Sequence, residues 1–152
     1  MEQIKMRTYM TDAPLKHAHA IRHLGIEHEN TGRLVLAERH YDQVLALYRE
    51  HSRQDDLDYA NAVRYPAVIK ERLGKDEESI ALWEEAYDRY VGVGIVEGVA
   101  EAAARLAILN HRKGEIEKGR EWFAKAKVAS EASSDPDTHK FISEVNAKIK
   151  NA

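Results

Sequence analysis

The chain has 152 residues, of which 43% are apolar and 32% are charged, and its formal net charge at pH 7 is −3. This length predicts a single domain, 1–152, because chains of about 100–200 residues usually bury one core. The lack of cysteine excludes disulfide frameworks, thiolate zinc sites, iron–sulfur clusters and cysteine nucleophiles. The charge gives no general attraction to nucleic acid or anionic lipid, and no apolar run has the length of a signal peptide or of a bilayer span. We therefore expect a cytoplasmic protein that binds neither nucleic acid nor membranes.

Three stretches of the sequence align with one another without gaps, and each closes on a glycine. They run from 18 to 32, from 60 to 74 and from 100 to 114, so the glycines are 42 and 40 residues apart. Apolar residues recur at helical spacing before each glycine, which is typical of a helix that ends at a C-cap glycine. Each stretch therefore predicts one helix followed by a tight turn.

A second pattern follows each glycine and predicts a second helix. A small residue stands five positions after the glycine, an aromatic residue nine positions after it, and a small or aliphatic residue twelve positions after it. These positions are Ala37, Tyr41 and Val44, then Ser79, Trp83 and Ala86, then Gly119, Phe123 and Ala126. The small residue allows two helices to approach, and the aromatic ring fills the space one turn further on.

Units of this kind resemble the tetratricopeptide repeat, whose signature is Leu-Gly in the first helix, a turn glycine, and then Ala, an aromatic residue and Ala in the second. Leu24-Gly25 matches the first-helix motif, whereas the second unit has Pro66-Ala67 there and the third has Gly119 in place of the usual alanine. The resemblance covers roughly residues 15–132 and is similar to the longer members, with about 40–42 residues per repeat. It implies an all-α, right-handed α-solenoid of three helix pairs.

The expected repeats span about 15–51, 56–92 and 96–132, with linkers at 50–55 and 91–94. A further helix over 136–150 begins at Pro136 and carries an apolar stripe of Phe141, Val145 and Ile149. Such a helix would cap the last repeat with a polar outer face. Two alternatives stay open for the first dozen residues, whose apolar side chains either pack on the first repeat or fray.

Catalytic and metal chemistry have little support in the sequence. His19, His23 and Glu27 are spaced to share one helix face, but there is no HExxH motif and no second cluster to complete a metal site. The acidic run 76–78 falls in the first turn of a predicted helix, where the helix dipole favours negative charge. No nucleophile elbow or phosphate-binding glycine loop occurs. We therefore expect no enzyme activity, no metal and no cofactor.

The resemblance implies that the first helix of each pair lines a concave groove, and helical geometry then selects the residues that face it. Aliphatic residues form one row across the groove, and arginines with a neighbouring tyrosine and histidine form a basic row beside it. The predicted peptide-binding residues are His19, Arg22, His23, Ile26, Asn61, Arg64, Tyr65, Val68, Glu101, Arg105, Ile108 and His111. An apolar floor beside arginines suits a peptide or protein segment that carries acidic residues, because arginine pairs bidentately with carboxylates.

Some proteins of the resembled family bind acidic chaperone tails through Lys, Asn and Arg, but here Ile26 and Glu101 replace two of those residues, which argues against that partner. The aliphatic row has a competing explanation as core, packed on a neighbouring repeat or under the C-terminal helix. The predicted function is a non-catalytic protein–protein interaction module. The alternative is a regulatory sensor or a self-associating scaffold, including a homodimer, that responds to a small ligand or peptide.

Overall fold

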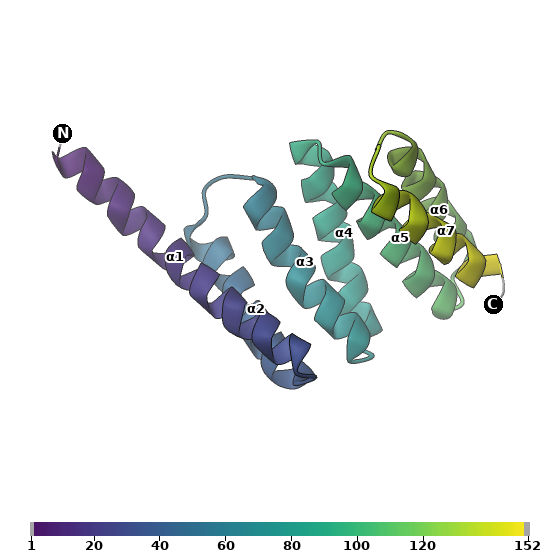
Figure 1. Cartoon of the computed structure of the whole chain (residues 1–152), viewed down its shortest axis with the longest axis horizontal. Coiled ribbons are helices and arrows are strands. Elements are labelled where there is room, and N and C mark those ends of the chain that lie inside the picture. Colours follow the sequence, from purple (N-terminus) through teal and green to yellow (C-terminus); the bar gives the residue numbers. More distant parts are fainter. Residues whose placement is uncertain (1, 151–152) are drawn as a thin grey trace. The chain divides into compact units, whose positions relative to one another are not determined.

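A computed structural model describes the backbone of residues 2–150 and the side chains from Ala13 onward. Within that range the chain consists of seven α-helices and contains no strand (Figure 1). The helices are α1 (Glu2–Asn30), α2 (Leu34–His51), α3 (Leu57–Arg72), α4 (Asp76–Val93), α5 (Val96–Arg112), α6 (Ile116–Glu131) and α7 (Pro136–Lys150). The predicted all-α fold class is confirmed.

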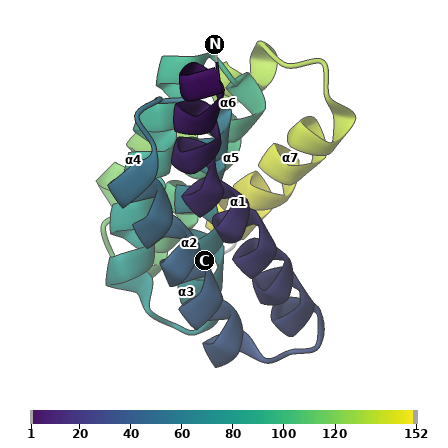
Figure 2. The ribbon, with the colours of Figure 1, turned by 90° about the vertical axis from the view of Figure 1, so that its left-hand side faces the viewer.

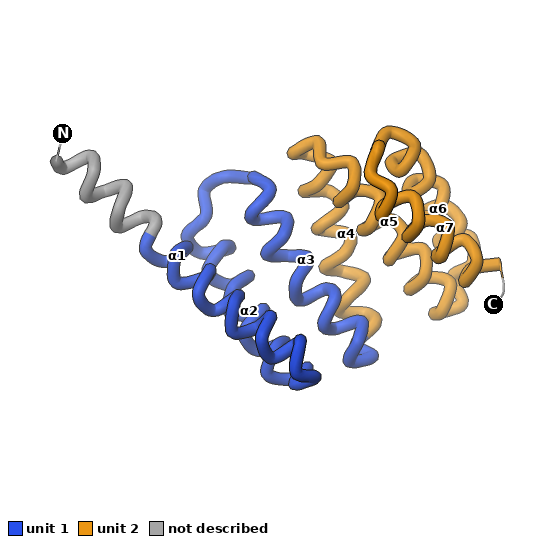
Figure 3. The backbone as a smooth tube through the Cα atoms, viewed as in Figure 1, with its two compact units in different colours: residues 1–75 blue, residues 76–152 orange. Residues whose placement is uncertain are grey.

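The helices divide between two compact units, residues 1–75 and residues 76–152 (Figure 3). The first unit holds α1, α2 and α3, in which α2 packs on both neighbours. The second holds α4, α5, α6 and α7, in which α5 packs on each of the other three. The boundary lies in the turn between α3 and α4, and the expectation of one domain stays a prediction.

The three predicted turn glycines do end helices α1, α3 and α5. Gly32, Gly74 and Gly114 have φ of 77°, 77° and 90°, in the left-handed region that suits glycine. After each, the next N–H donates to a carbonyl five residues back, as Lys75 does to Lys70 at 2.8 Å. These are the bonds of a Schellman motif, which satisfies carbonyl groups at a helix end.

The structure differs from the expected boundaries at two places. Helix α4 continues to Val93, so the predicted linker 91–94 is mostly helical, and the turn is made by Gly94, with φ of 75° and the same bond pattern. Helix α1 begins at Glu2, well before the expected start of the first repeat. The alternatives for the side chains of the first dozen residues lie outside the described residues.

The core of the first unit forms where α1 and α2 cross. Ala37, Tyr41 and Val44, the small, aromatic and aliphatic positions of the repeat, are at most 1% exposed. A Cβ atom at Gly25 would lie 2.6 Å from Cε1 of Tyr41, so only glycine admits the ring at this spacing. The glycine and the aromatic residue therefore set the distance between the two helices.

In the second unit, Ser79, Trp83 and Ala86 on α4 are fully buried, and a row of alanines on α5 allows close packing. The loop after α6 leads into α7, which packs on α5 and α6 (Figure 2). Ile142 and Val145 bury the apolar face of α7, while Phe141 and Ile149 pack at its edge. The sequence-predicted capping role of this helix within its unit agrees with these contacts.

A buried ion-pair network joins α2 to α3. Glu38, which is 8% exposed, accepts hydrogen bonds from Lys70 Nζ at 3.0 Å and from Lys75 Nζ at 2.9 Å. Lys70 also reaches Asp42 Oδ2 at 3.2 Å. Burial raises the pKa of Glu38, but the hydrogen bonds and charges of Lys75 and Lys70 outweigh it and lower the pKa below its ordinary value of 4.5.

We predict that Gly25→Ala destabilises the first unit by about 1–3 kcal/mol, because the new methyl group overpacks against Tyr41. Thermal and urea unfolding would measure the loss. The same change at Gly92, an exposed helical position, serves as the control and should be neutral or slightly stabilising. Equal stability of the Gly25→Ala protein and the wild type would contradict this account of helix spacing.

We predict that Glu38→Gln lowers the free energy of unfolding at pH 7 by about 1.5–3 kcal/mol, since charge-assisted hydrogen bonds are lost. Because the folded-state pKa of Glu38 is lowered, its contribution is fully present above 4.5 and is lost as pH falls through that lowered value. The difference between wild type and variant should therefore shrink between pH 7 and an acidic pH well below 4.5. Urea unfolding at both pH values measures it, and a difference independent of pH would contradict the assignment.

Candidate functional site

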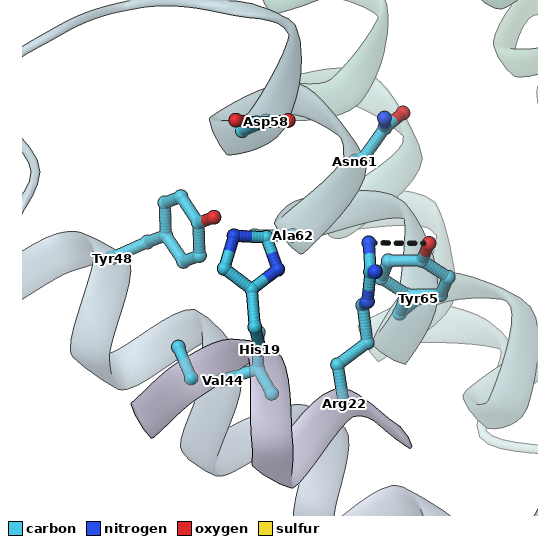
Figure 4. Close-up of a pocket in the computed structure, with 9 residues that line it drawn as sticks. His19, Arg22, Val44, Tyr48, Asp58, Asn61, Ala62 and Tyr65 are labelled. Atoms are coloured by element: carbon cyan, nitrogen blue, oxygen red, sulfur yellow. Dashed lines mark hydrogen bonds between the residues drawn. The ribbon is translucent and has the colours of Figure 1, made fainter. Parts of the chain in front are cut away.

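Four of the predicted binding residues come together in the first unit. His19 and Arg22 from α1 and Asn61 and Tyr65 from α3 line one recess, and α2 contributes Tyr48 to its wall (Figure 4). In this view the His19 ring lies between Tyr48 and Arg22. The remaining lining residues are Ala18, Val44, Asp58 and Ala62.

The recess continues into a wider cavity of about 220 Å³, with His19, Tyr48 and Asp58 shared between the two. The other residues that line this cavity are Leu15, Lys16, Ser52 and Asp56. Helix α3 thus brings carboxylates to an opening whose α1 side carries basic side chains. Burial first, and then the negative charges of Asp58 and Asp56, raise the pKa of Tyr48, so its phenol stays protonated at neutral pH.

Arg22 is held by Tyr65, which lines the recess and stacks on Tyr41. Its Nη1 donates to the Tyr65 hydroxyl at 3.4 Å, and its guanidinium carbon lies 5.8 Å from the centre of the Tyr65 ring. The Tyr65 ring stacks on Tyr41 at 5.2 Å, and the Tyr41 hydroxyl donates to Glu29 at 2.7 Å. The buried Nε of Arg22 has no hydrogen-bond acceptor among the described residues.

The other predicted residues of the first unit do not line the recess. His23 is exposed on α1, and Arg64 and Val68 are half-buried on α3. Ile26 packs against the core cluster of Ala37, Tyr41 and Ile69, so part of its surface belongs to the core. The aliphatic row was interpreted either as the floor of the groove or as core. Ile26 is partly buried in the core and partly exposed, so it fits both interpretations.

The predicted residues of the second unit lie on α5, beside α7. The guanidinium carbon of Arg105 lies 4.8 Å from the centre of the Phe141 ring, so Arg105 stacks on the C-terminal helix. Ile108 packs against the core cluster that includes residues of α7. Glu101 and His111 are half-buried on the same helix.

Sequence reasoning missed Asp58 and Tyr48, although each left a signal. Asp58, Asn61, Tyr65 and Val68 follow the spacing i, i+3, i+7, i+10, so the groove stripe could have been extended one turn towards the start of α3. Tyr48 stands sixteen residues after Gly32, a position that a tyrosine also occupies in the second repeat. Nothing in the repeat pattern indicated that this tyrosine would reach the recess.

Within residues 13–150, no group of three or more His, Asp or Glu side chains is arranged to hold a metal ion. His19 and His23 are both exposed on α1. A search of the described helices for one long and apolar enough to span a bilayer finds none.

The all-α helix content, the Schellman turns and the buried small and aromatic positions give a tetratricopeptide-like fold, as the sequence predicted. Among solved structures, the N-terminal domain of stress-induced protein-1 (STI-1) from C. elegans is similar, with a TM-score of 0.66 and 18% sequence identity. The similarity covers 88% of this chain and 98% of that domain. No protein-family model matches the sequence, and no curated protein matches it.

We predict that Val145→Asp releases α7 from α5, because Val145 is 1% exposed and a buried carboxylate there has no partner in the apolar cluster. Amide hydrogen exchange should show lost protection along α7, with the helices of the first unit unchanged. Ser143→Asp places the same charge on the exposed side of α7 and serves as the control. Unchanged protection of α7 in the Val145→Asp protein would contradict the packing described.

Proposed function

We propose that the chain is a non-catalytic interaction module that binds a segment of another protein along the first helices of its repeats. The recess between α1 and α3 is the part of this surface for which the described residues give the strongest support. Its half-buried Arg22, Asn61 and Tyr65 combine charge, an amide and an aromatic face, which are the groups that commonly recognise peptides.

The observation that carries the proposal is the buried Nε of Arg22. A buried N–H on a charged group without an acceptor costs about 1–3 kcal/mol or more, and a carboxylate from a partner would satisfy it once the Arg22 side chain turns towards the opening. The nearby hydroxyl of Tyr65 takes only one of the donors of the guanidinium, at a long distance of 3.4 Å. An acidic residue in the partner therefore fits this position.

The opposite charge lies at the other end of the opening. Asp56 and Asp58 line the cavity next to the recess, and the negative charge of each raises the pKa of Tyr48. A partner segment with an acidic residue beside Arg22 and a basic residue beside Asp58 would match both ends. The sequence-based expectation of an acidic partner is thereby extended to a segment of mixed charge.

In the second unit, two of the predicted binding residues are engaged by α7. Arg105 stacks on Phe141, and Ile108 packs in the cluster that α7 completes, so a ligand would meet α7 before it reached these side chains. We therefore assign the main binding role to the first unit.

Peptides selected from a random display library on the folded chain test the proposal. We predict that the selected peptides share an acidic residue and bind Arg22→Gln at least about tenfold more weakly, since truncating one partner of a buried charge pair costs about 2–5 kcal/mol. Arg39→Gln removes an exposed arginine of α2 and is the matched control, expected to leave affinity unchanged.

Three outcomes would count against the proposal. Peptides that bind wild type, Arg22→Gln and Tyr65→Ala equally would place binding elsewhere. A thermal shift with small metabolites in the absence of any peptide binding would favour the alternative of a regulatory sensor. A concentration-dependent mass in sedimentation without peptide binding would favour self-association.

A further inference from the structure

Two histidines from neighbouring helices meet in the first unit, away from the recess. His28 lies in the last turn of α1 and His40 lies in the middle of α2. Their ring centres are 5.0 Å apart and their planes are tilted by 33°. Both side chains are half-buried, so each can still reach solvent.

The hydrogen bond of His40 fixes which of its nitrogens is available. Nδ1 lies 2.8 Å from the backbone carbonyl oxygen of Leu36. A carbonyl oxygen only accepts, so Nδ1 carries the proton and Nε2 of the neutral ring keeps its lone pair. A ring N–H bonded to a backbone carbonyl is the arrangement that orients metal-binding histidines in proteins.

The spacing of the two rings also matches that of two imidazoles on one metal ion. A Zn–N bond is about 2.0–2.1 Å, and an imidazole centre lies about 1.1 Å behind its nitrogen, so two rings on a tetrahedral ion have centres about 5.1 Å apart. The observed 5.0 Å agrees with this value. The helices α1 and α2 therefore hold the two rings at a centre-to-centre distance that is compatible with a shared metal ion.

We propose that His28 and His40 form a two-histidine site for a divalent transition-metal ion of the Zn²⁺ or Cu²⁺ class. Imidazole nitrogens suit these ions, and water completes the coordination, because the described residues offer no third His, Asp or Glu ligand. The bound ion would join the end of α1 to α2 beside the turn at Gly32. This site is independent of the peptide surface proposed above.

A second pair of histidines in this chain competes for the metal ion and must be removed for the experiment. His19 and His23 are exposed one turn apart on α1, a spacing that also lets two imidazoles share an ion. The test therefore uses the full chain without an affinity tag and with His19→Ala and His23→Ala together as the background. His28→Gln and His40→Gln are then introduced separately, with circular dichroism to verify that each variant is folded.

Calorimetric titration with Zn²⁺ should give one bound ion per background chain. Because loss of even an outer partner weakens metal binding by about 10- to 100-fold, either glutamine variant should bind at least that much more weakly. Cu²⁺ bound to the background chain should show nitrogen hyperfine structure from two imidazoles by electron paramagnetic resonance. Zn²⁺ should also raise the melting temperature of the background chain and leave that of the folded His40→Gln variant unchanged.

Two results would overturn the proposal. One is the absence of Zn²⁺ and Cu²⁺ binding by the folded background chain. The other is binding that is equally tight in the background chain and in both glutamine variants, which would assign the ion to other residues.

Discussion

The contact between a glycine on one helix and an aromatic ring on the next is the constraint on which the structure depends. Tyr41 lies directly against Gly25, and in the second unit Tyr90 lies directly against Gly98. In each case a side chain on the glycine would occupy the place of the ring. Because the ring is rigid and almost wholly buried, it fixes both the separation and the register of the helices. The residues that face the recess are in turn positioned by that register.

Two of the three arginines predicted to bind a ligand also join helices within their units. Arg22 of α1 contacts the ring of Tyr65 on α3, and Arg105 of α5 contacts the ring of Phe141 on α7. Each contact places a cation over an aromatic ring, although Arg22 stands ten residues before its turn glycine and Arg105 stands nine before its own, so the two arginines are not at the same repeat position. Both arginines thus have a packing role that exists before any partner binds. In the first unit the same guanidinium remains at the edge of a recess, which is why the proposed function rests there.

Much of the fold could be predicted from the sequence because its determinants are local and repeated. Each glycine turn follows from the φ that only glycine adopts readily, and the buried positions follow from the spacing of small and aromatic residues. The end of α4 was predicted too early, because Gly92 and Gly94 both looked like turn glycines in the sequence. Of the two, only Gly94 has a positive φ. The buried network around Glu38 was not foreseen, since charged residues on a helix usually indicate an exposed face.

The candidate site was predicted in part, for a physical reason. Helical spacing places residues on one face of a helix, and it identified His19, Arg22, Asn61 and Tyr65 in this way. It gives no information on which neighbouring helix closes the site, so Tyr48 from α2 and the position of α7 beside Arg105 became clear only from the tertiary packing. The contact between His28 and His40 is of the same kind, because the two residues are twelve positions apart in the sequence and lie on either side of a turn.

The proposed binding of a partner protein at the recess of the first unit can be tested by photocrosslinking in cells. A photoreactive amino acid is placed at position 61, in the recess, or at position 128, where Val128 is 69% exposed on α6. We expect a specific protein adduct from position 61 that disappears when Arg22 is changed to glutamine, and no such adduct from position 128. Adducts from position 128 alone, or adducts from position 61 that persist without Arg22, would contradict it.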